Sequence, residues 1–306
     1  MLHMTIGIFG NTDAVGNLSK KLGKPGTIND IAIYNHGSSE GVFTYACVNS
    51  DKIQTLLQVV NMADVPVLAV SEINAALGEQ IICISEFGFD TGFMVLDGVP
   101  EEQISPLIKG TCIEKFHIIK DGTELVEELK KLKIQRGEEL LVPIDNYFDV
   151  KSVGTVILGI MKSGSIKKYD KVMIQPLEKE VMIKGIQSQD KDFDSTEPGM
   201  RVGLNLKGIE AEELKRGYII AAGNTAKSKS FRFKLKKSRY SREQLKENDP
   251  VFVSAGLQVS AAKVKSAGEL LELETESSML YTENTKFLIA TTKQNMPRII
   301  GSAMIA

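Results

Sequence analysis

The sequence is poor in the residues from which metal sites and disulfides are built. Its 306 residues include only three cysteines and three histidines. The cysteines are odd in number, far apart and embedded in apolar runs, so we expect buried thiols rather than disulfides or a metal cage. The histidines are scattered, the acids show no paired spacing, and no serine or cysteine lies in a nucleophile motif. We therefore predict no catalytic residue and no metal site.

Long hydrophobic runs are also missing. The apolar stretch at residues 152–161 contains two glycines and is far shorter than the ~20 residues that a membrane-spanning helix requires. Residues 1–10 have no basic region before their apolar run and no small-residue cleavage site, so they do not resemble a secretory signal. We expect a cytoplasmic protein without a membrane partner.

Arginine is absent from the first 135 residues. That part carries ten lysines and 17 acids, a balance of −7, whereas residues 136–306 carry 27 basic residues and 22 acids, a balance of +5. Because arginine suits bidentate phosphate contacts and stacking on bases, an anionic partner of the second part is one explanation. A plain difference in charge between domains is the other, and composition alone leaves both open.

Periodicity divides the chain into three parts. Residues 1–135 alternate helical patterns at 51–62 and 125–132 with β-type runs at 5–9, 43–48, 65–70, 81–85, 93–96 and 117–119. From residue 136 on, short apolar runs are separated by turn signals. We predict a multi-domain α/β plus all-β protein, with an α/β domain at 1–135 followed by two β-barrels at 136–223 and 224–306.

A segment with two glycines follows the first predicted strand. Residues 10–17 read GNTDAVGN. A strand, a glycine loop and a helix form the context in which backbone amides cradle a phosphate. The candidate cofactor-binding residues are therefore Gly10, Asn11, Asp13, Gly16 and Asn17.

The side-chain chemistry of a nucleotide site is nevertheless incomplete. In the pattern G-x-x-x-x-G-K-[ST], Val15 replaces the second glycine, Gly16 the lysine and Asn17 the hydroxyl residue. NSDK at residues 49–52 and DGVP at residues 97–100 stand where a GTPase has Asp-x-x-Gly and Asn-Lys-x-Asp. We predict a degenerate P-loop GTPase-like domain that has no cofactor, or binds GTP and magnesium weakly, and has lost hydrolysis.

The middle of the chain carries a set of specific motifs. Residues 142–174 contain Pro-Ile-Asp-Asn-Tyr-Phe, Gly-Thr-Val and Ser-Gly-Ser-Ile-Lys, and residues 197–221 contain Gly-Met-Arg-Val-Gly-Leu-Asn-Leu-Lys-Gly. This region resembles domain 2 of the translational GTPases of the EF-Tu and SelB family, apart from Asn146 in place of an acid. The overall resemblance is to the SelB-like factors of methanogens, a group that includes EF-Pyl.

The resemblance implies a binding mode. In this family, domain 2 and the G domain together hold the aminoacylated 3′ end of a tRNA, and domain 3 contacts the acceptor stem. By this resemblance Asp145, Asn146 and Arg201 would border the aminoacyl pocket, and Lys207 and Arg216 would face backbone phosphate. A purely structural alternative stays open, in which Asp145 caps a turn and Arg201 pairs with a neighbouring acid.

The third part begins with a strongly basic run. Residues 227–246 contain nine basic residues and one acid. Alternation places Arg232, Lys234 and Lys236 on one face of a strand, and Arg239 follows it. A cationic face of this kind would neutralise phosphates, so that binding would tolerate many sequences and weaken with salt. The plain alternative is a solvated surface.

Three hypotheses follow. The first is a translation-factor-like protein that binds aminoacyl-tRNA or another RNA, with the ribosome as a further partner and no DNA. The second is a GTPase with divergent loops. The third is an interaction module whose acidic first domain binds a basic protein.

Overall fold

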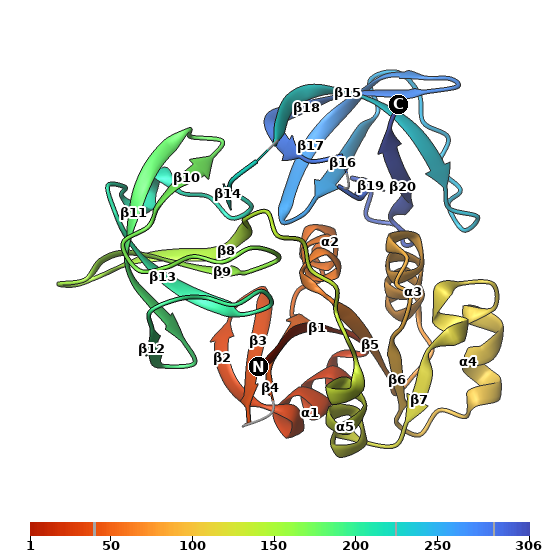
Figure 1. The fold of residues 1–306 in the computed structure, drawn as a ribbon. Helices are drawn as coiled ribbons and strands as arrows, with labels where there is room; N and C mark the ends of the chain where they lie inside the picture. The colour runs from red at the N-terminus through yellow and green to blue at the C-terminus, as the bar shows by residue number, and fades with distance from the viewer. Residues whose placement is uncertain (39–40, 224, 284) are drawn as a thin grey trace.

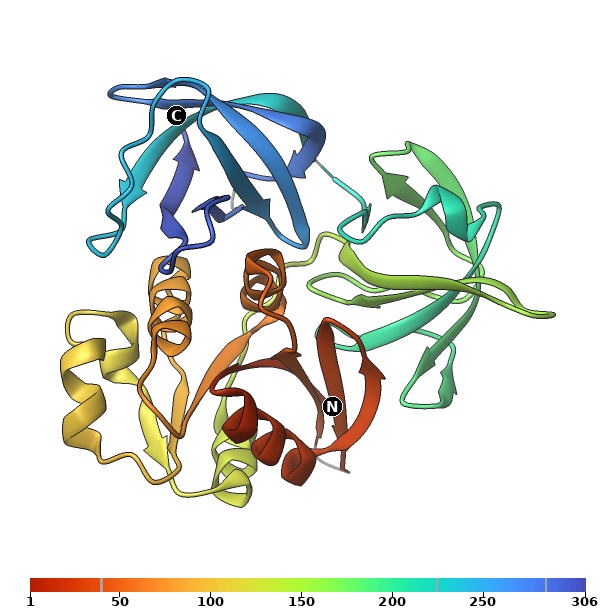
Figure 2. The same cartoon turned by 180° about the vertical axis from the view of Figure 1, so that it is seen from behind.

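A computed structural model describes residues 1–38, 41–223, 225–283 and 285–306. The chain folds into an α/β part and two β-sheet parts, and each part contacts the other two (Figures 1 and 2). The predicted fold class is therefore confirmed. The predicted boundary between the second and third parts involves residue 224, which lies outside the described residues.

The first part is built on a seven-stranded sheet in the order β2-β3-β4-β1-β5-β6-β7. Its strands are β1 (Leu2–Gly10), β2 (Lys24–Ile28), β3 (Ile31–Gly37), β4 (Gly41–Val48), β5 (Val65–Val70), β6 (Phe93–Leu96) and β7 (His117–Ile119). The strands from β4 to β7 are parallel, whereas β2 and β3 extend the sheet as an antiparallel hairpin beyond β4. All six residues of β5 are buried, as expected of a central parallel strand with both faces covered.

Helices cover both faces of this sheet. They are α1 (Thr12–Leu22), α2 (Ile53–Met62), α3 (Ala75–Phe87), α4 (Glu101–Ile108), the short 3-10 helix η1 (Cys112–Lys115) and α5 (Gly122–Lys131). Apolar residues of α1 and α5 share one core cluster with the sheet, and those of α2, α3 and α4 share the other. No helix in the described ranges combines the length and the hydropathy needed to cross a membrane.

One predicted strand is wrong, because residues 81–85 belong to α3. The side-chain oxygen of Asn74 caps this helix by accepting the N–H of Leu77. Leu77, Ile81 and Ile84 then bury one face at helical spacing. A short apolar run fits either a buried strand or a buried helix, and the cap decides between them here. The hairpin of β2 and β3 was not identified in the sequence.

The second part is an antiparallel sheet closed on itself. Its strands are β8 (Leu141–Val150), β9 (Gly154–Ile160), β10 (Lys171–Gln175), β11 (Lys179–Ser188), β12 (Lys191–Phe193), β13 (Arg201–Lys207) and β14 (Ile219–Ala221), with the 3-10 helix η2 (Ala211–Glu213). Strand order is β10-β14-β8-β9-β13-β11-β12, and an additional pairing of β10 with β11 closes the ring. A core of apolar residues such as Ile144, Ile157 and Leu204 fills its interior.

The third part is a closed six-stranded barrel. Its strands are β15 (Ala226–Lys237), β16 (Pro250–Ala255), β17 (Gln258–Ala267), β18 (Leu271–Tyr281), β19 (Phe287–Thr291) and β20 (Ile299–Ile305). The alternation expected in β15 is confirmed, since Phe231 and Phe233 point into the barrel while Arg232 and Lys234 are exposed. The rings of Phe231, Phe233 and Phe287 pack together in the core, with centroids 4.8–5.8 Å apart.

Candidate functional site

The segment predicted as a phosphate-binding loop is mostly helical. Helix α1 begins at Thr12, so only Asn11 separates it from the last residue of β1. Ala14, Val15 and Leu18 are buried at helical spacing against the sheet, which explains why residues 12–17 form helix. The expectation of a loop over residues 10–17 is therefore wrong, because the buried face of the helix extends almost to the strand.

The backbone groups at this edge of the sheet already have partners. The N–H of Gly10 donates to Oε1 of Gln80 at 2.7 Å, and Nε2 of Gln80 donates back to the Gly10 carbonyl at 3.0 Å. The side-chain oxygen of Asn11 accepts the N–H groups of Ser71 and Glu72 at 2.8 and 3.1 Å. The backbone N–H groups of Gly10, Ser71 and Glu72 are thus already bonded to protein side chains.

The five candidate cofactor residues are divided between the end of β1 and the first turns of α1. Asp13, Gly16 and Asn17 lie within little more than one turn of α1, with Asp13 and Asn17 exposed. Gly10 lies in the strand at a φ of 126°, and a Cβ there would stand 1.8 Å from the carbonyl oxygen of Ala69. Gly10 is therefore required for close strand packing. Within the described residues no group of three or more His, Cys, Asp or Glu could hold a metal ion.

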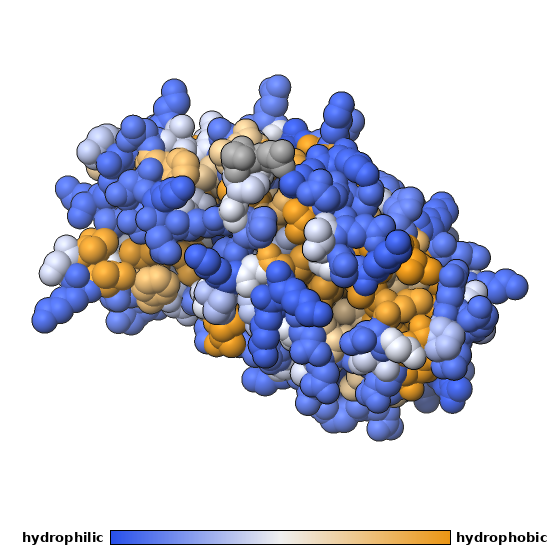
Figure 3. All heavy atoms as spheres, turned by 90° about the horizontal axis from the view of Figure 1, so that it is seen from below, coloured by the Kyte–Doolittle hydropathy of each residue, from blue (hydrophilic) through white to orange (hydrophobic). Residues whose placement is uncertain are grey.

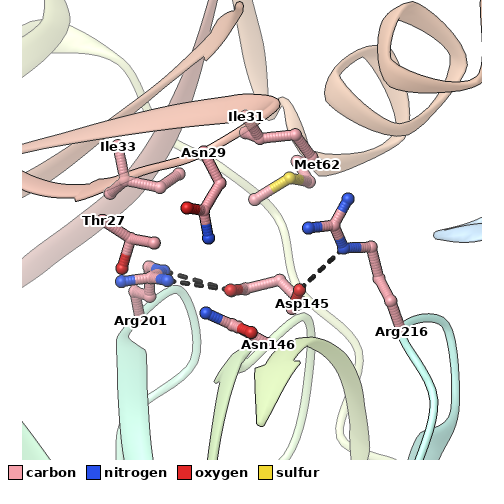
Figure 4. Close-up of a pocket in the computed structure, with 9 residues that line it drawn as sticks. All are labelled: Thr27, Asn29, Ile31, Ile33, Met62, Asp145, Asn146, Arg201 and Arg216. Atoms are coloured by element: carbon pink, nitrogen blue, oxygen red, sulfur yellow. Dashed lines mark hydrogen bonds and ion pairs between the residues drawn. The ribbon is translucent and has the colours of Figure 1, made fainter. Parts of the chain in front are cut away.

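A small pocket lies where the first part meets the second (Figure 4). It brings together Asp145 and Asn146 of β8, Arg201 of β13, and Arg216, which follows η2. The first part closes the pocket with residues of β2, β3, their turn and α2, namely Thr27, Asn29, Ile31, Ile33 and Met62. The structure thus places four of the predicted RNA- or aminoacyl-binding residues around one pocket.

Arg201 forms a bidentate ion pair inside this pocket. Its Nη2 lies 2.8 Å from Oδ1 of Asp145, and its Nε lies 3.1 Å from Oδ2 (Figure 4). The two side chains are only 11% and 6% exposed. The geometry is that of the structural alternative stated for Arg201, pairing with a neighbouring acid. The Asp145 carboxylate therefore has both oxygens occupied.

Arg216 connects the second part to the first. Its Nη1 and Nη2 reach the Asp30 carboxylate at 2.6 and 3.0 Å, and its Nε donates to the carbonyl of Asp145 at 2.9 Å. The hydrogen bond from Arg216 lowers the pKa of Asp30, and the same bond raises the pKa of Arg216. Arg216 therefore holds the β2–β3 hairpin against β8 rather than extending into solvent.

A much larger groove between the first and second parts adjoins the pocket. Thr27 and Arg201 line both, and the groove has about 1510 Å³ of space open to water, against about 10 Å³ in the pocket. The second-part wall includes Phe148 and Val153, each 40% exposed, with Val150, Val156 and Leu158 half-buried beside them. This wall is an apolar patch of partly exposed side chains.

The opposite wall of the groove is cationic. Lys20, Lys21 and Lys24, at the end of α1 and the start of β2, line it with exposed side chains. Acids of the second part, Asp190, Asp192 and Glu197, line the other side, where Glu197 pairs with the N-terminal ammonium. Seen from below, polar side chains cover most of the molecule and leave apolar patches between them (Figure 3). Sequence reasoning missed these lysines because only the fold brings them and Phe148 to the same groove.

The remaining predicted RNA-binding residues lie away from the pocket. Arg232, Lys234 and Lys236 are exposed on β15, but the neighbouring strand β18 carries acids, and Arg232 pairs with Glu272 at 3.3 Å. Arg239 donates to the carbonyl of Lys109 and lies over the ring of Tyr240, so it contacts the first part. Lys207 is exposed at the end of β13.

Buried charges also join the parts. Asp64 of the first part accepts a hydrogen bond from Arg136 at 2.7 Å and lies 3.4 Å from Nζ of Lys162 in the second part. Burial alone would raise the pKa of Asp64, but the positive charges of Lys162 and Arg136 hold it below its ordinary value. Burial lowers the pKa of Lys162, and the Asp64 charge opposes that shift.

A second buried pair joins the first and third parts. Arg298, next to β20, reaches Glu79 of α3 with Nη2 at 2.5 Å and Nε at 3.0 Å, and the two side chains are 8% and 3% exposed. Around it, apolar residues of α2 and α3 share one core cluster with Leu257, Leu288 and Ile299 of the barrel. The three parts are therefore held together by packed and charged contacts.

Comparisons with known proteins give the relationships of the chain. Residues 154–221 match the family described as Elongation factor Tu domain 2. The uncharacterised protein MJ0325 of Methanocaldococcus jannaschii is 32% identical over 308 residues, covering 98% of this chain and 99% of that protein. The selenocysteine-specific elongation factor of the same organism is 38% identical over 108 residues, which cover 33% of this chain and only 23% of the factor.

A solved structure extends the likeness to the whole fold. Translation elongation factor SelB from Methanococcus maripaludis, in complex with the GTP analogue GPPNHP, superposes with a TM-score of 0.85 over 100% of this chain and 79% of that chain, at 19% identity. At that identity the likeness concerns the fold alone. Together with the domain 2 match, it shows a chain with the fold of a SelB and EF-Tu type factor whose residues 154–221 belong to the elongation factor Tu domain 2 family.

Proposed function

We propose that this chain is an elongation-factor-like protein that binds the 3′ end of a tRNA in the groove between its first and second parts, and that it does not use GTP hydrolysis to time this binding. The observation that carries the proposal is the groove itself, which combines an apolar wall with a lysine wall. The relatives named as elongation factors support a ligand of this class. The ribosome remains a predicted partner.

The two walls suit the two parts of a nucleotide, namely the aromatic base and the phosphate. Phe148 and the valines around it offer a surface on which a base can stack, an interaction worth about 1–3 kcal/mol per base. Lys20, Lys21 and Lys24 face the same space and can neutralise phosphates of the strand. The exposed cations of β15, Arg232, Lys234 and Lys236, would extend this contact to the third part.

Hydrogen bonds at the edge of the first sheet support the proposal that GTP hydrolysis no longer controls this protein. There the N–H groups of Gly10 and Ser71 already donate to the side-chain oxygens of Gln80 and Asn11. No lysine of the phosphate-loop pattern follows, since Gly16 occupies its position. In GTPases the γ-phosphate orders switch segments that move the domains. Here the Asp64, Arg216 and Arg298 ion pairs fix the parts directly.

The test is tRNA binding, measured by fluorescence anisotropy over a salt series. We expect binding that weakens as salt rises, with the double variant Lys20→Glu/Lys21→Glu losing affinity and about two units of the salt slope, since each lost phosphate contact removes about one. The control is Lys130→Glu/Lys131→Glu, which changes the same two charges in the last turn of α5, outside the groove. If the control loses as much affinity as the α1 variant, or if the wild type does not bind at all, the groove is not the RNA site.

A further inference from the structure

We propose that the second part moves as one body against a rigid unit made of the first and third parts, and that the contact between Arg216 and Asp30 is the latch that fixes the width of the groove. The motion is inferred from the contacts between the parts and is independent of the ligand that the groove takes. In Figure 1 the third part covers the ends of α2 and α3, whereas the second part lies beside β2 and β3.

The third part is attached to the first by apolar packing. Four of its buried residues belong to the core cluster of α2 and α3, namely Leu257, Leu288, Ala290 and Ile299. The buried pair of Arg298 and Glu79 joins the same two parts. Because apolar packing does not depend on charge, salt does not screen it. The first and third parts therefore form one unit.

The second part has much less apolar attachment to the first. Among the described residues, Ile160 is the one buried residue that the second part contributes to either apolar cluster of the first part. The other buried apolar residues of the second part form a separate cluster inside its own sheet. Domains move relative to one another unless the interface between them is large and hydrophobic. Of the two β-sheet parts, the second is therefore the one that can move.

Two groups of charges hold the second part to the first, and they differ in exposure. Arg136 and Lys162 reach Asp64 inside the interface, where the side chains of Arg136 and Asp64 are 10% and 6% exposed. The side chains of Arg216 and Asp30 are 27% and 35% exposed. Salt screens exposed ion pairs strongly and buried ones much less. The Asp64 contact thus has the properties of a hinge, and the Arg216 contact those of a latch.

Arg216 also connects the latch to the third part. Its Nη1 donates to Oε1 of Gln58 in α2 at 3.2 Å, and Nε2 of Gln58 donates to the carbonyl of Leu257 in the third part at 3.1 Å. Its Nε donates to the carbonyl of Asp145, at the irregularity in the pairing of β8 with β9. One side chain of the second part is thus bonded to β8 and, through Asp30 and Gln58, to the rigid unit.

The groove lies between the two bodies. Lys20, Lys21 and Lys24 on one wall belong to the rigid unit, whereas Phe148 and Val156 on the other belong to the second part. A swing of the second part about the Asp64 contact therefore changes the distance between the walls. The structure is the latched state, and loss of the Arg216 contacts releases the second part.

The experiment is double electron–electron resonance on the intact chain, with two pairs of spin labels. Cys112, which is partly exposed whereas Cys47 and Cys83 are buried, is first replaced by Ser. Labels at Lys21→Cys and Lys151→Cys report the distance between the first and second parts. Labels at Lys21→Cys and Lys263→Cys report the distance between the first and third parts. All three lysines are exposed.

In Arg216→Ala we expect the first-to-second distance to shift or spread by more than about 2 Å, the size of a domain rearrangement, while the first-to-third distance stays unchanged. The matched control is Arg232→Ala, which removes an exposed arginine paired with Glu272 inside the third part, and should change neither distance. An unchanged first-to-second distance in Arg216→Ala, or an equal change in both distances, overturns the inference.

A salt series on the chain with Arg216 intact gives the same test if Arg216→Ala does not fold. Raising NaCl from 0.1 M to 1 M shortens the screening length from about 10 Å to about 3 Å. We expect the first-to-second distance to spread at high salt and the first-to-third distance to stay constant, because only the latch is an exposed ion pair. If both distances are constant, or if they spread together, the second part is not a separate moving body.

Discussion

The buried pair of Arg298 and Glu79 gives a quantitative prediction about how the parts are held together. Replacing Arg298 by Met leaves the Glu79 carboxylate, 3% exposed, with the backbone N–H of residue 298 at 2.7 Å as its remaining partner across the interface. Removing one partner of a buried ion pair costs about 3–5 kcal/mol, because the other charge stays desolvated. For a chain of 306 residues, with an unfolding entropy of about 2.1 cal/mol/K per residue, that loss corresponds to a melting temperature lowered by roughly 5–8 °C.

The double variant Glu79→Met/Arg298→Met distinguishes the effect of the unpaired buried charge from the effect of the changed side-chain shape. Replacing both charges by apolar groups of similar length removes the uncompensated carboxylate, so the double variant should recover about 1–3 kcal/mol relative to Arg298→Met. Full recovery is not expected, since the Arg298 N–H and the Asp51 carbonyl also lose their hydrogen-bond partner.

The assay is urea unfolding followed by far-UV and near-UV circular dichroism. Two probes are needed because a chain of three parts can unfold in more than one step. Coupling between the two sites follows from the double-mutant cycle. A loss below about 1 kcal/mol in Arg298→Met, or a double variant no more stable than that single variant, would refute the view that this pair clamps the barrel to α3.

Three further predictions follow from the contacts around the first part. The pKa values of Asp64 and Asp30 in the folded protein lie below their ordinary value of 3.8, so the stabilisation from their ion pairs is fully present above that pH and is lost as the pH falls through the lower, folded values. Melting temperatures measured from pH 6 to pH 3 should therefore fall at the acid end. Asp64→Asn should make this dependence of the melting temperature on pH weaker. Gly10→Ala should destabilise the folded protein by more than about 2 kcal/mol, because the added Cβ clashes with Ala69. Gly16→Ala should stabilise it by about 0.5–1 kcal/mol, because the Cβ points into open space and alanine favours helix. A destabilising Gly16→Ala would contradict a helix at this position. Calorimetric titration with GTP and magnesium should give no binding heat, and small-angle scattering should be unchanged by GTP; a change of shape would mean that the nucleotide still sets the domain arrangement.

Local sequence determined much of the fold. The alternation at residues 231–237 placed phenylalanines inside and cations outside because side chains of a strand point to opposite faces, and the structure has that arrangement. The turn glycines and apolar runs after residue 136 specified short antiparallel strands, which need only near neighbours to form. The missing phosphate-loop lysine was equally visible, because it is a matter of residue identity at one position.

Tertiary structure alone decided what the candidate site residues do. Arg216 meets Asp30 across 186 positions of sequence, and Arg201 meets Asp145 across 56, so no local pattern reveals that these cations are already paired. Residues 12–17 became helix because buried contacts with the sheet outweighed the glycine at position 16. Lys20 and Lys21 became one wall of a groove only when a barrel more than a hundred residues downstream packed opposite them. A property that depends only on residue type, such as a missing lysine, can be predicted from the sequence. A property that depends on which side chains are in contact can be determined only from the folded structure.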